Sequence, residues 1–470
     1  LKLLQKSYYG KIKMIYIDPP YNTGKDFVYK DDFHDSLENY KRITGQIDST
    51  GKLLRSNVET SGRYHTDWLN MLFPRLKLSR NLLTNDGVIF ISIDDSELAN
   101  LKKICDEVFG EENYINTVSV NMKNIAGASG GGEDKKLKKN IEYILVYSKN
   151  YNDFTSFNNV YEYTEIGQLV EKYRAEEISW KYTSVLVYEG DKKYLGSTVD
   201  GDGNEIKIYS RDNAIIKSIG QVMRDEGITE TDAYNKYARK IFQTAMPQSS
   251  IRPRVMDKVR EIGGTSDIYS IEYIPKTGRN KGELYEQFYK GDNFRLFAWL
   301  SDVSEIIDGK LYKKDLQGTF WNYVGETKNL TKEGGIPFPN GKKPLALVKR
   351  LLEMQSDKNS LILDFFSGSA TTAHAVMQLN AEDGGNRKYI LVQLPENLDE
   401  MYKCADSSTK KDIQEQIDLL DSIEKPHYIS ELGKERIRRA GEKIKEEKGL
   451  EAMNLDVGFK VLKLDTSNIR

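Results

Sequence analysis

The chain has 470 residues, of which 39% are hydrophobic and 30% are charged, so it is long enough for two or three domains with sizeable cores. Its 69 lysines and arginines nearly balance its 71 aspartates and glutamates, for a net charge of -2, so a contact with nucleic acid would need local basic surface. The two cysteines exclude a disulfide framework, and the four histidines show no metal-ligand spacing. No apolar run could cross a bilayer and no secretory leader opens the chain. We therefore expect a cytoplasmic protein with no metal and no membrane partner.

The first part of the chain, residues 1–150, alternates strand and helix signals as a helix-covered parallel sheet requires. A short apolar run ends at Asp18, because the two prolines that follow it cannot continue a strand ladder. The other signals are apolar residues at helical spacing or in continuous runs. The predicted elements are the strand 14–17, a helix through Trp68, Leu72 and Leu76, the strand 88–93, a helix through Leu98, Leu101 and Cys105, and the strand 141–147.

The alternation stops at residues 151–287, which are rich in tyrosine and charge, and it returns in residues 288–400. We therefore predict an α/β fold with a Rossmann-like sheet in two halves, separated by an inserted domain at 151–287. Residues 401–470 are highly charged and predicted to be helical, with a last strand at 457–464. The chain opens without a methionine, and we expect it to be trimmed at both ends.

The tetrapeptide Asp18-Pro19-Pro20-Tyr21 stands where the first strand ends. Its chemistry suits an exocyclic amine such as N6 of adenine, whose lone pair stays delocalised until acceptors draw the amine hydrogens out of the ring plane. Asp18 can accept one hydrogen bond, and the Pro19 carbonyl, held by the rigid Pro19-Pro20 pair, can accept the other. Tyr21 offers a face on which an extruded base stacks. The alternative interpretation is a strand end with a proline stop, since four-residue matches occur by chance.

A second motif follows the predicted strand 361–363, where a loop of small residues leads into a helix. Small residues let a ligand approach the backbone closely, and the start of a helix supplies free N–H groups. Glu396, beyond a predicted strand at 389–394, stands where an acid would hold ribose hydroxyls. A plain packing turn is the alternative for the loop. The candidate ligand-binding residues of the motif are Asp364, Phe366, Ser367, Gly368, Ser369 and Thr371.

Together the two motifs resemble the modification subunits of type III restriction-modification systems, within the β class of amino-methyltransferases. In that class the Asp-Pro-Pro-Tyr motif comes first, a target-recognition domain follows, and the cofactor loop comes last, which is the order found here. The resemblance implies a sheet of the S-adenosylmethionine-dependent methyltransferase type, with the catalytic domain in 1–150 and 288–400 and target recognition in 151–287. The stretches that carry it are 18–24, 64–95, 318–321, 334–344 and 361–396.

The resemblance also implies roles for individual residues. Asp18 and the Pro19 carbonyl would bind the target amine, and Tyr21 would stack on the flipped base. Asp364 would lie near the methionine end of the cofactor, and Glu396 would bind its ribose. The remaining residues that would line the cofactor are Phe366, Ser367, Gly368, Ser369 and Thr371.

The implied reaction is methyl transfer from S-adenosylmethionine to N6 of an adenine in double-stranded DNA, by a homodimer that works with a separate helicase-nuclease restriction subunit. Two alternatives stay open: an N4-cytosine or other amino-methyltransferase, and a truncated or catalytically impaired DNA-binding specificity subunit. Ala370 stands where glycine is usual, which we expect to be tolerated, and Lys343 is expected to be solvated. The basic groups at 135–139 and 436–448 are either solvated faces or contacts to DNA phosphates.

Overall fold

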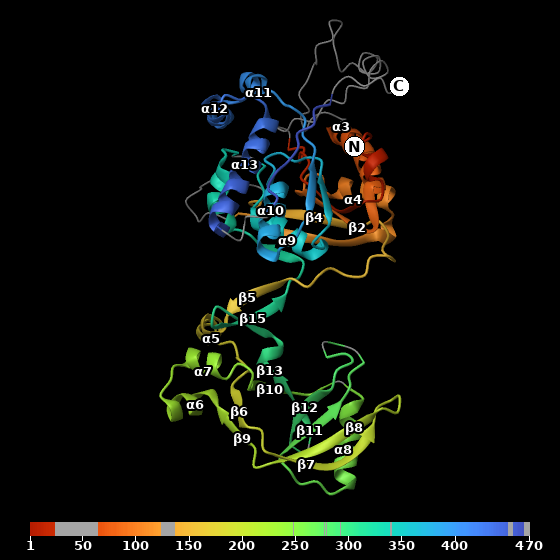
Figure 1. The fold of residues 1–470 in the computed structure, drawn as a ribbon, viewed down its shortest axis with the longest axis vertical. Helices are drawn as coiled ribbons and strands as arrows, with labels where there is room; N and C mark the ends of the chain where they lie inside the picture. The colour runs from red at the N-terminus through yellow and green to blue at the C-terminus, as the bar shows by residue number, and fades with distance from the viewer. Residues whose placement is uncertain are drawn as a thin grey trace. The chain divides into compact units, whose positions relative to one another are not determined.

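The structure is a computed structural model that describes residues 1–23, 64–123, 137–247, 249–276, 278, 280–291, 293–338, 341–449 and 455–464. The chain forms two compact units (Figure 1). Unit 1 consists of Leu1–Val160 and Gln317–Arg470, and unit 2 of Tyr161–Leu316. The chain therefore leaves unit 1 once and returns to it, so that unit 2 is an insertion.

Unit 1 is built around a seven-stranded sheet. Its strands are β1 (Ile12–Ile17), β2 (Leu83–Ile93), β3 (Tyr114–Asn121), β4 (Ile141–Ser148), β16 (Phe320–Asn322), β17 (Leu361–Asp364) and β18 (Lys388–Leu391). Their order is β16-β3-β4-β2-β1-β17-β18. The four strands β2, β1, β17 and β18 are parallel, and β4 runs antiparallel between β2 and β3. This confirms the predicted α/β fold with a Rossmann-like sheet.

Helices cover both faces of this sheet (Figure 1). They are α3 (Tyr64–Leu82), α4 (Leu98–Phe109), α9 (Leu345–Gln355) and α10 (Thr371–Asp383). Successive strand residues point to opposite faces, so Ile15 of β1 packs in one core with Trp68 of α3 and with α4. Its neighbour Met14 packs in a second core with Leu351 of α9 and Val376 of α10. Burial on both faces explains why the central strands are continuously apolar.

The register of β1 and β17 brings the two motifs together. Met14 lies opposite Ile362 and Ile15 opposite Leu363 in parallel pairing. Asp18 directly follows β1, and Asp364 is the last residue of β17, so both carboxylates stand at the carboxyl ends of adjacent parallel strands. In open α/β sheets this edge is where ligands bind.

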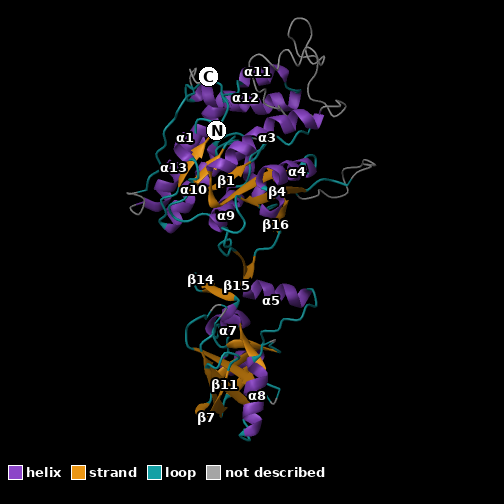
Figure 2. Cartoon of the chain, turned by 90° about the vertical axis from the view of Figure 1, so that its right-hand side faces the viewer, coloured by secondary structure: helices purple, strands orange, loops and turns teal. Residues whose placement is uncertain are grey.

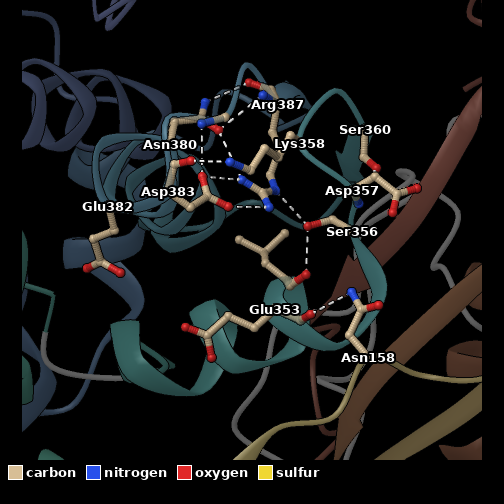
Figure 3. Close-up of polar contacts among 12 residues, drawn as sticks. Asn158, Glu353, Ser356, Asp357, Lys358, Ser360, Asn380, Glu382, Asp383 and Arg387 are labelled. Atoms are coloured by element: carbon tan, nitrogen blue, oxygen red, sulfur yellow. Dashed lines mark hydrogen bonds and ion pairs between the residues drawn. The ribbon is translucent and has the colours of Figure 1, made fainter. Parts of the chain in front are cut away.

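Arg387 fixes the turn between α10 and β18 (Figure 3). Its Nη2 donates to Asp383 Oδ2 at 2.8 Å, and its Nε donates to the Ser356 hydroxyl at 2.8 Å, directly after α9. The Asn380 side chain both donates to the Arg387 carbonyl and accepts from its N–H, each at 3.0 Å. The contact joins α9 and α10 to β18, and β18 in turn pairs with β17, so it supports the strand that carries Asp364.

The C-terminal part of unit 1 is helical, as predicted, with α11 (Leu398–Cys404), α12 (Ser407–Ser422) and α13 (Ile429–Lys448). Apolar side chains of α13, among them Ile437 and Ala440, pack on α10. The predicted strand at 457–464 is wrong, because this segment has no regular secondary structure. Val457 and Phe459 pack on the same cluster, whereas Leu462 is 91% exposed. The alternation of apolar and polar residues that suggested a strand therefore reflects burial of one side of a segment that pairs with none of the described strands.

Unit 2 contains an eight-stranded antiparallel sheet and a three-stranded one. The strands of the larger sheet are β6 (Ser184–Tyr188), β7 (Asp191–Val199), β8 (Glu205–Asp212), β9 (Ile215–Ser218), β10 (Ile241–Ala245), β11 (Ile268–Tyr273), β12 (Tyr285–Lys290) and β13 (Arg295–Trp299). The helices are α5 (Ile166–Ala175), α6 (Ile219–Glu226), α7 (Glu230–Lys236) and α8 (Ile251–Glu261). In Figure 2, α8 lies along this sheet, where Val255 and Val259 pack on Ile208 and Ile271.

The first and last strands of unit 2 pair with each other. β5 (Tyr161–Glu165) is antiparallel to β15 (Lys310–Leu316), with Tyr161 opposite Leu316, and β14 (Ser304–Ile307) completes the three-stranded sheet. The predicted end of the insertion at residue 287 falls inside β12, and the unit continues to Leu316. Composition did not mark this boundary because the strands after β12 continue the same antiparallel architecture. Among the described residues, no helix combines the length and apolar character needed to span a bilayer.

Candidate active site

The Asp-Pro-Pro-Tyr turn is held from both of its ends. On the side of the prolines, the Trp68 indole N–H donates to the Pro20 carbonyl at 2.6 Å. On the other side, Asn22 adopts a left-handed backbone with φ of 58° and donates from Nδ2 to Glu97 Oε1 at 2.6 Å. Glu97 is fully buried and also contacts His65 Nδ1 at 2.6 Å. The turn is therefore anchored to α3 and to the start of α4.

Lys343 lies inside this site and is not solvated, so the expectation from the sequence is wrong. Its side chain is 8% exposed, and its Nζ is 3.1 Å from Asp18 Oδ1 and 3.1 Å from Glu142 Oε2. The same ammonium is 4.7 Å from the ring centroid of Tyr21, and the Tyr21 hydroxyl donates to Glu142 Oε2 at 3.0 Å. A buried lysine thus bridges the carboxylate of the motif to a second carboxylate on β4.

The charges of this cluster shift one another's ionisation. Burial raises the pKa of Asp18 above its ordinary value, although Lys343 acts against this shift. Burial alone would raise the pKa of Glu142, but Lys343 and Tyr21 outweigh it and hold that pKa below its ordinary value. Burial would lower the pKa of Lys343, but the two carboxylates outweigh it and raise that pKa. The ammonium is therefore the stabilising centre of the cluster.

Asp18 keeps acceptor capacity. Lys343 approaches Oδ1 off the direction of a hydrogen bond, and within the described part of the chain this buried oxygen accepts no well-directed hydrogen bond. A buried polar atom without a hydrogen-bond donor is costly in a folded protein unless a ligand supplies the donor. An amine hydrogen is such a donor.

The loop of small residues between β17 and α10 is organised by Asp364. The side chain of Asp364 is buried and accepts the Phe366 N–H at 3.1 Å and the Thr372 hydroxyl at 2.6 Å. Burial raises its pKa to about 7. Gly368 has φ of +46°, in the left-handed region that favours glycine, and a Cβ added there would lie in van der Waals contact, 3.9 Å from the Phe338 ring and 3.9 Å from the Phe366 carbonyl. The Gly368 N–H donates to Gln393 Oε1 at 2.8 Å.

Ser369 and Thr371 face a guanidinium from the C-terminal helix. Arg436 of α13 is completely buried and donates from Nη1 to Ser369 Oγ at 2.9 Å and to Thr371 Oγ1 at 2.7 Å. Its Nη2 donates to Glu333 Oε2 at 3.0 Å. Burial lowers its pKa to about 10, against the opposing effect of Glu333. Arg436 is therefore a structural residue and is neither solvated nor available to a phosphate, whereas Arg438 and Lys443 of the same predicted basic group are 41% and 71% exposed.

Ala370 sits at the N-terminal cap of α10 with φ of 61°. This left-handed conformation costs a non-glycine residue about 1–2 kcal/mol, which explains why glycine is usual at the position. The side chain of Ala370 is buried and faces Gly433 of α13. The alanine is accommodated sterically and carries backbone strain.

Lys342, next to Lys343, points to a different set of partners. Its Nζ donates to the carbonyls of Thr331, Glu333 and Ile336, at 3.0, 2.8 and 3.0 Å. Burial lowers its pKa to about 8. Of these two adjacent lysines, Lys343 therefore contacts Asp18, and Lys342 binds the segment whose Glu333 side chain contacts Arg436.

Glu396 is half-buried in the loop after β18, which ends at Leu391 and not at the predicted residue 394. Burial raises its pKa to about 7. In the predicted basic group at 135–139, Lys139 pairs with Asp94 at 2.9 Å and with Asp95, while Lys135 and Lys136 lie outside the described residues. Groups of three or more residues able to hold a metal ion do not occur within the described ranges.

Comparisons with known proteins agree with this geometry. A family model described as DNA methylase matches residues 12–403. The chain is 37% identical over 384 residues to the probable type III restriction-modification enzyme HindVI Mod subunit of Haemophilus influenzae, covering 81% of this chain and 46% of that protein. It is 30% identical to the EcoPI Mod subunit of Escherichia phage P1, over 88% of this chain and 60% of the relative.

A third relative, the type III EcoP15I Mod subunit of Escherichia coli, is 31% identical over 99% of this chain and 63% of its own length. The chain thus spans 46% to 63% of the length of these three relatives. The matched family model includes both motifs and the whole sheet that joins them. The chain belongs to the DNA methylase family.

Proposed function

We propose that this chain carries the methyl-transfer machinery of a DNA adenine N6-methyltransferase, the modification subunit of a restriction-modification system. The observation that carries the proposal is the pairing of β1 with β17, which sets Asp18 beside Asp364 and the cofactor loop at one edge of the sheet. The carboxylate of Asp18, buried beside a lysine, is suited to accept a hydrogen bond from an amine.

S-adenosylmethionine fits the residues at the loop. Gly368 turns the loop with a positive φ and no side chain, the half-buried Glu396 can accept hydrogen bonds from hydroxyls, and Asp364 holds the loop by accepting the Phe366 N–H. We propose that Asp364, Phe366, Ser367, Gly368 and Glu396 bind the cofactor, with Ser369 and Thr371 lining the loop where Arg436 holds them. When bound, the cofactor supplies an electrophilic methyl group on a sulfonium.

The residues of the turn would act on the target base. Tyr21 stacks on an adenine flipped out of the duplex, and Asp18 and the Pro19 carbonyl accept the two hydrogens of its amine. These contacts localise the nitrogen lone pair and aim it at the methyl group. Positioning of this kind supplies much of the rate, because it replaces a bimolecular encounter, and the rigid Pro20 and its bond to Trp68 fix the geometry.

The remaining parts of the proposal concern partners. Unit 2, inserted between β4 and β16, would read the target sequence in double-stranded DNA. The protein would act as a homodimer, in the cytoplasm, with a separate helicase-nuclease restriction subunit. The names of the relatives as Mod subunits of type III restriction-modification enzymes support the role of a modification subunit.

The test is to incubate the protein with methyl-labelled S-adenosylmethionine and mixed-sequence duplex DNA, and to digest the DNA to nucleosides. We expect label in N6-methyladenine, its loss in Asp18→Asn, and its retention in Asp153→Asn, which alters an exposed carboxylate of unit 1. Label in N4-methylcytosine would overturn the choice of base. Binding of cofactor and DNA without any label would instead identify an impaired specificity subunit.

A further inference from the structure

Three charged side chains from three separate elements meet at the end of β1. Asp18 follows β1, Glu142 belongs to β4, and Lys343 precedes α9. The exposed fractions of their side chains are 15%, 24% and 8%, and the lysine is within 3.1 Å of an oxygen of each acid. Such an arrangement is not a surface ion pair, because the desolvation of each charge is offset mainly by the other two.

Without the ammonium, the same pocket would hold two carboxylates with Asp364 nearby. Two like charges at a shared buried site favour protonation of one of them. The other groups that bear on Asp18 are the phenols of Tyr16 and Tyr21 and the carboxylate of Asp364, while Lys123 bears on Glu142. Among the residues that the structure describes, Lys343 is the cation that contacts Asp18 itself.

We infer that Lys343 is a positioning residue for the reaction: by bridging Asp18 and Glu142 it keeps Asp18 ionised and fixed, so that the carboxylate accepts a hydrogen of the target amine. Glu142 completes the arrangement, because it holds the Tyr21 hydroxyl at 3.0 Å and thereby sets the ring on which the base would stack. This inference rests on the proposed function.

The chemical need is specific. During transfer, the new N6–C bond forms as the C–S bond breaks, the sulfur keeps that electron pair, and one N6 proton passes to Asp18 or to water. A protonated Asp18 would be a weaker acceptor for the amine hydrogen and could not take up the N6 proton. Because the active form of Asp18 is ionised, activity is lost as pH falls through the pKa of Asp18.

Lys343→Met removes the charge and keeps most of the volume. In a plot of kcat against pH, we expect the acid limb, where kcat falls as pH is lowered, to move to higher pH by about one unit or more. The reason is that the lost ammonium had favoured the ionised form of Asp18. Lys343→Arg should restore much of the original profile. Glu142→Gln should move the acid limb to lower pH, because it removes a negative charge near Asp18 and leaves Asp18 as the carboxylate that pairs with Lys343.

Lys342→Met is the matched control. It also removes a buried lysine from the same segment, but one that binds backbone carbonyls and not Asp18. It should lower stability and leave the position of the acid limb unchanged. A Lys343→Met profile that coincides with that of Lys342→Met would overturn the inference and leave the proposed function intact.

A second measurement needs no methyl transfer. Infrared difference spectra of the Asp18 carboxyl, assigned by subtraction of Asp18→Asn, report its ionisation as pH is varied in the wild type and in Lys343→Met. We expect a higher midpoint in the variant even if the wild-type protein methylates nothing, and circular dichroism selects folded samples. An unchanged midpoint would contradict the role of Lys343.

Discussion

Arg436→Met tests whether the C-terminal helix α13 holds the loop between β17 and α10, where we propose that the cofactor binds. The substitution removes three charge-assisted hydrogen bonds, to Ser369, Thr371 and Glu333, from a completely buried site. Each such bond contributes about 1.5–3 kcal/mol, but removing the arginine also removes its own desolvation cost. Removing one partner of a buried ion pair typically costs about 3–5 kcal/mol. We therefore expect the free energy of local unfolding of the loop and the start of α10 to fall by this amount.

Hydrogen exchange read by mass spectrometry on peptides that span the loop and α10 measures this loss directly. A change of about 3–5 kcal/mol corresponds to acceleration by roughly one hundred to several thousand fold. Arg438→Met is the control, because Arg438 is 41% exposed and makes one bond of 3.5 Å within the same helix, worth at most about 1 kcal/mol. If exchange in α10 were no faster in Arg436→Met than in Arg438→Met, the clamp would carry no stability and the reasoning would fail.

Ala370→Gly should change the stability by less than about 1 kcal/mol, because relief of about 1–2 kcal/mol of left-handed strain is opposed by the added unfolded-state entropy and by the loss of a buried methyl group. Ala373→Gly, in the first turn of α10, loses a buried methyl group without relief of strain and should destabilise the fold by about 1–2 kcal/mol; urea unfolding measures both. Trp68→Phe and Trp321→Phe each remove a donor to a backbone carbonyl, at 2.6 and 2.7 Å, and should cost similar stability, about 1–3 kcal/mol. Only Trp68→Phe should also lower kcat, since it frees Pro20; equal kcat losses would count against this role. Burial and nearby cations lower the pKa of His374 to about 3, so its contribution to stability is present above about pH 6.5 and is lost as pH falls. At pH 5 the loss is about 2 kcal/mol, and His374→Leu should lack it; parallel stability curves for the two proteins between pH 8 and pH 5 would refute this.

The parts of the site that the sequence predicted are those with local signals. Asp18 ends an apolar run at a proline stop, and Asp364 ends another before small residues, so both strand ends could be placed without knowing the fold. That these two strands pair with each other was not predicted from the sequence, and it is seen only in the register of β1 and β17. Their adjacency is a property of the parallel sheet, in which carboxyl ends share one edge.

The buried charges could not be placed in this way. Lys343 stands beside Lys342 in a segment with prolines and glycine, and only partners distant in the chain, Asp18 and Glu142, make its burial favourable. Arg436 did leave a trace: with Leu432 and Ala440 it follows the four-residue spacing of the apolar face of α13. A charge on an apolar helical face indicates a buried partner, whereas Lys343 leaves no comparable pattern.

The paired ends of unit 2 bear on how such a protein can diversify. The chain departs after Val160 and re-enters at Gln317, whose N–H donates to the Val160 carbonyl at 3.2 Å, and the adjoining β5 and β15 form one short ladder. Re-entry leads to β16, which in the sheet borders only β3 at its edge. Genetic exchange of everything between these two points would carry the β5–β15 pair along with the insertion, and the central strands that carry Asp18 and Asp364 would be inherited unchanged.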